Sequence, residues 1–138
     1  MPSQEHEALV AMLSEAAVGA GTVEESRAAF EAMLSMVPVP EDVNVESLTI
    51  NGFDADWVSA PDVPADRVVL YLHGGGYVIG SNVAYRELAS RISRATNARV
   101  LLINYRLAPE HPHPAAVEDA VAAYEFILEQ GIPAERVM

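Results

Sequence analysis

Cysteine, lysine and long apolar runs are all missing from this 138-residue chain. Without cysteine, neither a disulfide nor a thiolate nucleophile is available. The eight basic residues, all of them arginine, stand against 20 acidic ones, and the formal net charge is −12. Such a charge repels phosphate backbones and anionic lipids, so we expect no nucleic-acid partner and no membrane partner. No apolar run approaches the roughly 20 residues that span a bilayer.

The start of the chain also lacks the features of a secretory leader. Residues 1–7 carry neither the basic n-region nor the apolar h-region of a signal peptide. Together with the absence of cysteine, this favours a cytoplasmic protein. With 51% hydrophobic and 20% charged residues, the composition is that of a globular domain with a core rather than of a disordered chain.

Hydrophobic periodicity in the first part of the chain predicts two helices. An apolar stripe of helical period that includes Leu9 predicts the first helix over 5–18. Thr22 and Glu25 have the spacing of a capping box, and the helix that they begin is expected to bury Phe30. Both stripes are interpreted as packing surfaces, with a substrate-lining lid as the alternative.

After residue 40 the pattern changes from helical periods to extended segments, and then to alternating strands and helices. Strands are predicted over 43–50 and 55–59, and Asn51-Gly52 between them is a tight hairpin signal. The predicted elements that follow are a strand over 67–72, a helix over 84–96 with Leu88 on its inner face, a strand over 99–105, a helix over 115–130, and a loop over 133–138 entering another strand. Such strand–helix alternation implies a parallel sheet with helices on its faces, an α/β fold.

The strand over 67–72 runs directly into His73-Gly74-Gly75-Gly76-Tyr77. Three consecutive glycines after a buried strand leave backbone N–H groups bare and close enough to hold a developing negative charge, which is the requirement of an oxyanion hole. The alternative is a tight turn without function. Three glycines cost backbone entropy, however, and an idle turn seldom needs them.

A second motif begins about thirty residues later, with Tyr105-Arg106-Leu107-Ala108-Pro109-Glu110 followed by His111-Pro112-His113-Pro114. The two motifs together closely resemble the hormone-sensitive-lipase-like family of α/β-hydrolase carboxylesterases, and the resemblance is tight over about residues 45–138. Two departures are His113, where the family usually has Phe, and Asn104, where it often has Asp. Arg106 and Glu110 are expected to brace the turn, because a buried arginine needs an acidic partner.

This resemblance implies a fold and a reaction. The fold is the N-terminal portion of an α/β-hydrolase, with a helical cap segment over 1–40 and the N-terminal half of the hydrolase domain over 41–138. The reaction is ester hydrolysis through an acyl-enzyme, with a serine nucleophile and with neither a metal nor a cofactor. The implied substrates are small molecules: short- to medium-chain acyl esters, or lactones.

The resemblance also assigns roles within the glycine motif. Matching family positions make Gly74 and Gly75 the donors of the oxyanion hole, and Gly76 supplies the backbone freedom for the turn. His73 is interpreted as a residue that orients the loop through a backbone hydrogen bond, because the catalytic base of this fold follows the serine and the acid in chain order. Tyr77 either lines the acyl pocket or packs the loop.

None of the triad residues of a serine esterase is identified in the chain. No Gly-x-Ser-x-Gly occurs, and the strand that precedes the nucleophile in the family begins near Val137. Ser81 lacks the flanking glycine pair, so it is not expected to replace the nucleophile. We therefore expect the N-terminal half of a longer hydrolase, inactive by itself. The alternatives are a non-catalytic small-molecule-binding homologue, an inactive truncated fragment, or a half completed by a second chain; a homo-oligomer is also possible.

Overall fold

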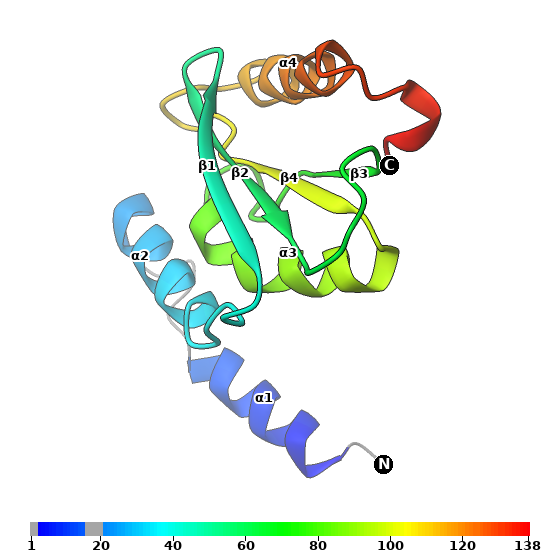
Figure 1. Ribbon diagram of the computed structural model, residues 1–138. Coiled ribbons are helices and arrows are strands. Elements are labelled where there is room, and N and C mark those ends of the chain that lie inside the picture. Colours follow the sequence, from blue (N-terminus) through cyan, green and yellow to red (C-terminus); the bar gives the residue numbers. More distant parts are fainter. Residues whose placement is uncertain (1–2, 16–20) are drawn as a thin grey trace.

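The computed structural model describes residues 3–15 and 21–138. Two helices come first, a β-hairpin follows, and the rest alternates between strand and helix (Figure 1). The elements are α1 (Gln4–Glu15), α2 (Val23–Leu34), β1 (Asn44–Ile50), β2 (Phe53–Ser59), β3 (Val68–Tyr71), α3 (Asn82–Thr96), β4 (Arg99–Ile103), α4 (Ala115–Glu129) and a 3-10 turn (Ala134–Arg136). Within the described ranges, no helix has the length and apolar character needed to cross a membrane.

The four strands form one mixed sheet in the order β1-β2-β4-β3. β2 is antiparallel to both β1 and β4, whereas β3 and β4 are parallel. On the other side of β3, the N–H of Met138 donates to the carbonyl O of Val68 at 2.9 Å, and the Met138 carbonyl O accepts from the N–H of Leu70 at 2.8 Å. At Val137, where a strand is expected to begin, the chain forms an isolated parallel bridge to Val68.

Helices cover both faces of the sheet, α3 on one side and α4 on the other (Figure 1). Side chains along β4 alternate between these two layers. Leu101 and Ile103 pack in the cluster that includes α4, and Val100 and Leu102 pack in the cluster that includes α3. All four are fully buried, which explains why this strand is a continuous apolar run in the sequence.

The prediction for the inner face of α3 is wrong at one position. Leu88 is 40% exposed, whereas Ala89 and Ser93 are completely buried. The Ser93 hydroxyl donates to the carbonyl O of Ala98 at 2.7 Å and accepts from the N–H of Ala60 at 2.9 Å. Small and hydrogen-bonded residues thus form the buried face of the helix, and hydropathy does not mark such residues as core.

The hairpin is confirmed at the predicted turn. Asn51 and Gly52 have φ of 46° and 93°, and the flanking residues Ile50 and Phe53 pair directly across the two strands. Positive φ at both central residues is the requirement of a type I′ turn, which matches the twist of the strands on either side.

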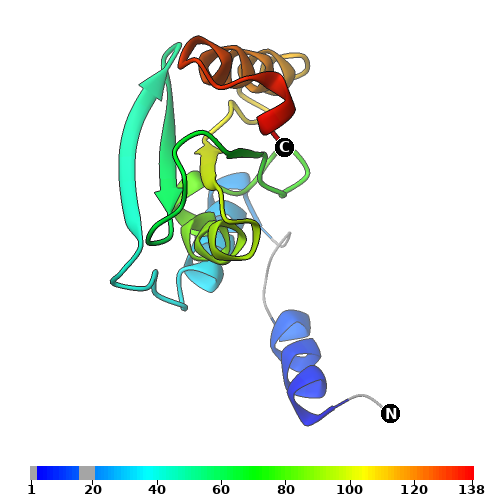
Figure 2. The same ribbon diagram turned by 45° about the vertical axis from the view of Figure 1, so that its right-hand side comes forward.

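The two N-terminal helices differ in how they are placed. α2 begins with the predicted capping box: the Thr22 hydroxyl accepts from the N–H of Glu25 at 3.2 Å, and the Glu25 carboxylate accepts from the N–H of Thr22 at 2.8 Å. Phe30 in α2 is only half-buried. α1 extends away from the sheet (Figure 2), and Leu9 is 49% exposed, so the packing expected at Leu9 is wrong. Residues 16–18 of the first predicted helix lie outside the described residues.

Candidate functional site

The turn between β3 and α3 is the glycine loop, residues 73–80. Its backbone turns sharply because φ is positive at three successive residues: Gly75 (136°), Gly76 (60°) and Tyr77 (62°). The N–H groups of Val78 and Ile79 both donate to the carbonyl O of Gly75, at 3.1 Å and 3.0 Å. These two bonds close the turn on itself and fix the peptide plane that follows Gly75.

The N–H groups of the three loop glycines have no acceptor in the described part of the chain. Among residues 3–15 and 21–138, no backbone or side-chain group accepts a hydrogen bond from the N–H of Gly74, Gly75 or Gly76. All three glycines line a cavity of about 670 Å³. Bare donors beside a cavity are available to an incoming oxygen atom, which is the chemistry that an oxyanion hole requires.

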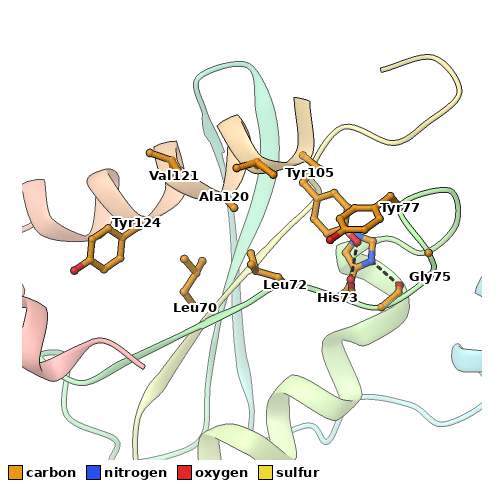
Figure 3. A pocket seen from close by; sticks show the side chains of 13 residues that line it. Leu70, Leu72, His73, Gly75, Tyr77, Tyr105, Ala120, Val121 and Tyr124 are labelled. Carbon is orange, nitrogen blue, oxygen red and sulfur yellow. Dashed lines mark hydrogen bonds between the residues drawn. The ribbon is translucent and has the colours of Figure 1, made fainter. Parts of the chain in front are cut away.

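The rest of this cavity is mainly apolar. Leu70 and Leu72 form its floor beside the loop, and Val121 and Tyr124 of α4 form a wall (Figure 3). Tyr77 is 63% exposed and lies at the end near the glycines. The arrangement places hydrogen-bond donors at one end and aliphatic and aromatic surface along the length of the cavity.

Two glycines of the loop leave no room for a side chain. A Cβ atom at Gly75 would overlap the carbonyl O of Ile79, and one at Gly80 would lie 2.6 Å from Nδ1 of His73. A Cβ atom at Gly76 would meet nothing within 4 Å. The requirement for glycine is therefore steric at positions 75 and 80 and purely conformational at position 76. The sequence analysis did not identify Gly80 as a residue that the loop requires. Its position two residues before helix α3 could have indicated this.

His73 is held between two tyrosines beneath the loop. Its ring is 4.3 Å from the Tyr105 ring at an interplanar angle of 16°, and 5.5 Å from the Tyr85 ring at 22°. Its Nδ1 lies 2.9 Å from the carbonyl O of Gly74, and a carbonyl only accepts, so Nδ1 carries the proton. The Nε2 atom is buried and has no partner among the described residues. The backbone hydrogen bond expected for His73 is therefore present.

Burial controls the charge of His73. The side chain is 3% exposed. Loss of hydration lowers the pKa of His73 below its usual value, and the hydrogen bond to the Gly74 carbonyl opposes that shift only in part. At neutral pH the ring is thus uncharged. An uncharged, stacked imidazole holds the loop by packing and by one hydrogen bond.

The tyrosines that hold His73 also bind the loop backbone. The Tyr105 hydroxyl donates to the carbonyl O of His73 at 2.6 Å (Figure 3). The Tyr85 hydroxyl donates to the carbonyl O of Gly74 at 3.3 Å. Desolvation raises the pKa of both phenols, which keeps them protonated as donors. Sequence reasoning used Tyr105 only as part of a motif and passed over Tyr85.

The acidic partner expected for Arg106 is wrong. Arg106 donates from Nε to the Asp119 carboxylate at 3.0 Å and from Nη2 to Glu118 at 3.0 Å, both on α4. Glu110 instead pairs with Arg27 of α2 at 2.8 Å. Arg106 thus pairs with acids on helix α4 rather than with Glu110 of its own turn, and Glu110 pairs with an arginine on helix α2.

Ser81 has a structural task at the end of the loop. It is the N-cap of α3, and its hydroxyl accepts from the N–H of Ala84 at 3.2 Å.

The described part of the chain holds no group of three or more His, Cys, Asp or Glu residues arranged to bind a metal ion.

Comparison with known proteins identifies related sequences over the same region. A sequence profile of the alpha/beta hydrolase fold matches residues 69–138, slightly more than half of the chain. That stretch contains the glycine loop, both tyrosines that hold His73, and the wall that α4 contributes to the cavity.

Individual relatives carry esterase names. The chain is 46% identical over 121 residues to the acetyl-hydrolase of Streptomyces hygroscopicus, covering 85% of this chain and 39% of that protein. It is 39% identical over 101 residues to the esterase LipI of Mycobacterium tuberculosis, covering 68% and 32%. The crystal structure of an esterase from the bacterial hormone-sensitive lipase family superposes with a TM-score of 0.93 at 44% identity, covering 99% of this chain and 46% of that chain. The chain thus spans less than half the length of each.

Proposed function

Since the chain belongs to the α/β-hydrolase fold family, on its hormone-sensitive-lipase-like branch, we propose that it supplies the oxyanion hole and one wall of the acyl site of a carboxylic ester hydrolase. The observation that carries the proposal is the row of three glycine N–H groups that have no acceptor among the described residues and lie at one end of an apolar cavity. An ester needs both features: donors for its carbonyl oxygen and apolar surface for its acyl chain.

The proposed chemistry is attack of a serine hydroxyl on the ester carbonyl. The tetrahedral intermediate carries a negative oxygen, and the N–H groups of Gly74 and Gly75 donate to it without moving, since the turn is already closed. Loss of one such donor costs about 3 kcal/mol of transition-state stabilisation. In this proposal the serine, its histidine base and the acid belong to protein outside these 138 residues.

The other loop residues have supporting roles in the proposal. His73 orients the loop through its contact with Gly74, and Gly76 allows the turn its positive φ of 60°. Tyr77 lines the cavity beside the glycines and is proposed to contact the bound ester there. Residues 1–40 are proposed to be the cap segment, and residues 41–138 the first half of the hydrolase domain.

The proposed substrates are short- to medium-chain acyl esters or lactones. A cavity of about 670 Å³ with Val117 and Val121 in its wall has room for acyl groups of this size. The name of the acetyl-hydrolase relative agrees with the short end of that range.

The test is hydrolysis of p-nitrophenyl esters of increasing acyl length by the natural polypeptide, after its intact mass has been measured. A mass of 14.8 kDa corresponds to these 138 residues alone, which we expect to be inactive. A polypeptide about twice as long has room for the triad; it should hydrolyse the acetate and butyrate esters faster than the laurate. A polypeptide of that length that hydrolyses none of these esters contradicts the proposal and favours a non-catalytic binding protein.

A further inference from the structure

Arg27 of α2 binds three groups in two separate segments of the chain at once. Its Nε donates to the carbonyl O of Val78 in the glycine loop at 2.7 Å, and its Nη2 donates to the carbonyl O of Ala108 at 2.9 Å. Its Nη1 and Nη2 each donate to one carboxylate oxygen of Glu110, both at 2.8 Å. Only a guanidinium offers donors in this fork, since an ammonium is a single point charge.

The two carbonyl groups that Arg27 binds belong to the framework of the glycine turn. The N–H of Val78 donates to the carbonyl O of Gly75 at 3.1 Å, and the N–H of Ala108 donates to the carbonyl O of Tyr77 at 2.8 Å. Within the described ranges, the carbonyls of Val78 and Ala108 accept from no group besides Arg27. Val78 therefore links the guanidinium to the turn: its carbonyl O accepts from Arg27, and its N–H donates to the carbonyl O of Gly75.

The same face of α2 makes two further contacts with this region. The Glu31 carboxylate accepts from the Ser81 hydroxyl at 3.2 Å, and the Phe30 ring lies 6.2 Å from the Tyr85 ring. Arg27, Phe30 and Glu31 are spaced at i, i+3 and i+4, so they share one face of the helix. That face touches the end of the glycine loop, the start of α3 and the tyrosine that stacks on His73.

The hydrogen bonds from Arg27 to Val78, Ala108 and Glu110 are here called the clamp, and the charges of Arg27 and Glu110 stabilise it near neutral pH. Glu110 accepts two hydrogen bonds from Arg27, which lower the pKa of Glu110 to about 2 and raise the pKa of Arg27. Both partners are thus ionised throughout the neutral range. The bonds from Arg27 to the carbonyls of Val78 and Ala108 are partly buried, whereas its pairing with Glu110, which is 47% exposed, faces solvent.

We propose that Arg27 is a positioning residue, through which helix α2 sets the geometry of the glycine loop for the reaction. The effect of Arg27 on catalysis rests on the proposed function, whereas the hydrogen bonds of the clamp are present in the structure whatever the function is. It gives the N-terminal segment a task besides covering a substrate: α2 holds the Val78 carbonyl and so fixes the turn that presents the Gly74 and Gly75 N–H groups.

The test compares Arg27→Ala, Arg27→Lys and Glu110→Gln with Arg94→Ala as a matched control in the natural polypeptide. Arg94 also pairs with an acid distant in the sequence, Asp42, but it lies near the C-terminal end of α3, whereas the loop precedes the N-terminal end of that helix. We expect kcat for a p-nitrophenyl ester to fall at least tenfold in Arg27→Ala with KM changed less than threefold. Arg27→Lys should recover part of the loss, and Arg94→Ala should match the wild type.

Amide hydrogen exchange separates the clamp from the chemistry. The N–H groups of Val78, Ile79 and Ala108 are bonded within the clamped region, and we expect their exchange to be at least tenfold faster in Arg27→Ala but unchanged in Arg94→Ala. If the wild type hydrolyses no ester, the proposed function fails and the exchange rates alone decide the inference. Unchanged exchange in Arg27→Ala overturns it, as does unchanged kcat in an active enzyme. Should Arg27→Ala not fold, Arg27→Lys and Glu110→Gln provide the same comparison.

Discussion

Alanine at position 75 is the sharpest perturbation of the glycine loop, because it leaves every functional group in place. Gly75→Ala keeps the N–H that is proposed to bind the oxyanion and adds a single methyl group. That methyl group would overlap the carbonyl O of Ile79, and the backbone at position 75 has φ of 136°. The loop must therefore open, and the change acts only through geometry.

The cost follows from what opening the loop breaks. The hydrogen bonds from Val78 and Ile79 to the Gly75 carbonyl are lost, at about 1 kcal/mol each. These bonds oppose the opening, whereas the overlap with Ile79 and the roughly 1–2 kcal/mol of a side chain at positive φ favour it. An opened loop no longer holds the Gly75 N–H in place, and the loss of one oxyanion donor costs about 3 kcal/mol, which corresponds to a decrease in kcat of roughly 10²- to 10³-fold.

Gly76→Ala is the matched control, since it has positive φ but open space around its Cβ. Its cost is about 1 kcal/mol, so kcat should fall about fivefold or less. The assay is steady-state hydrolysis of p-nitrophenyl butyrate by both variants of the natural polypeptide, with thermal unfolding recorded in parallel. A Gly75→Ala enzyme as active as Gly76→Ala would refute the steric reasoning.

Three further predictions concern stability, each measured by urea unfolding. Asp56 is fully buried and accepts from Ser47, Asn82 and Arg86, so Asp56→Ala should lower the free energy of unfolding by about 3–5 kcal/mol; a loss below about 1 kcal/mol would contradict this. Burial lowers the pKa of His73 in the folded state, so its contribution is complete above about pH 6.5 and is lost as pH falls below that value; His73→Gln should flatten this dependence. The pKa of Glu110 is lowered to about 2, so the stability difference between wild type and Glu110→Gln should be constant above about pH 5 and vanish as pH falls through about 2; a difference that persists at the lowest pH would count against the ion pair.

Local sequence signals predicted the elements that depend on neighbouring residues. The capping box at Thr22 and the Asn51-Gly52 turn are both present in the structure. Each is decided by interactions within a few residues, such as a side chain bonding a nearby N–H or a backbone angle that only certain residues adopt.

Long-range polar contacts could not be read from the sequence. Arg27 and Glu110 are 83 residues apart, and nothing in the local pattern around either residue selects the other from the many acids and arginines available. The same holds for the stack of His73 between two tyrosines, which forms only after β3, α3 and the end of β4 are assembled. The sequence therefore located the glycine loop but not the contacts that hold it.

The buried face of α3 shows a different limit. Periodicity placed the helix correctly but chose Leu88 for its inner face, whereas the buried positions include Asn82 and Ser93. Small and polar residues are buried there because they satisfy hydrogen bonds with β2 and with the start of β4, and a hydropathy pattern carries no information about such partners.

The central claim is that the N–H groups of Gly74 and Gly75 bind the oxygen of a tetrahedral intermediate. The most direct measurement is the NMR spectrum of the natural polypeptide labelled with ¹⁵N-glycine, before and after reaction with a p-nitrophenyl alkylphosphonate, which forms a stable tetrahedral adduct on a serine nucleophile. We predict that the amide protons of Gly74 and Gly75 move strongly downfield, while that of Gly131, beyond α4, stays in place. An adduct that forms and leaves the Gly74 and Gly75 signals unmoved would contradict the account.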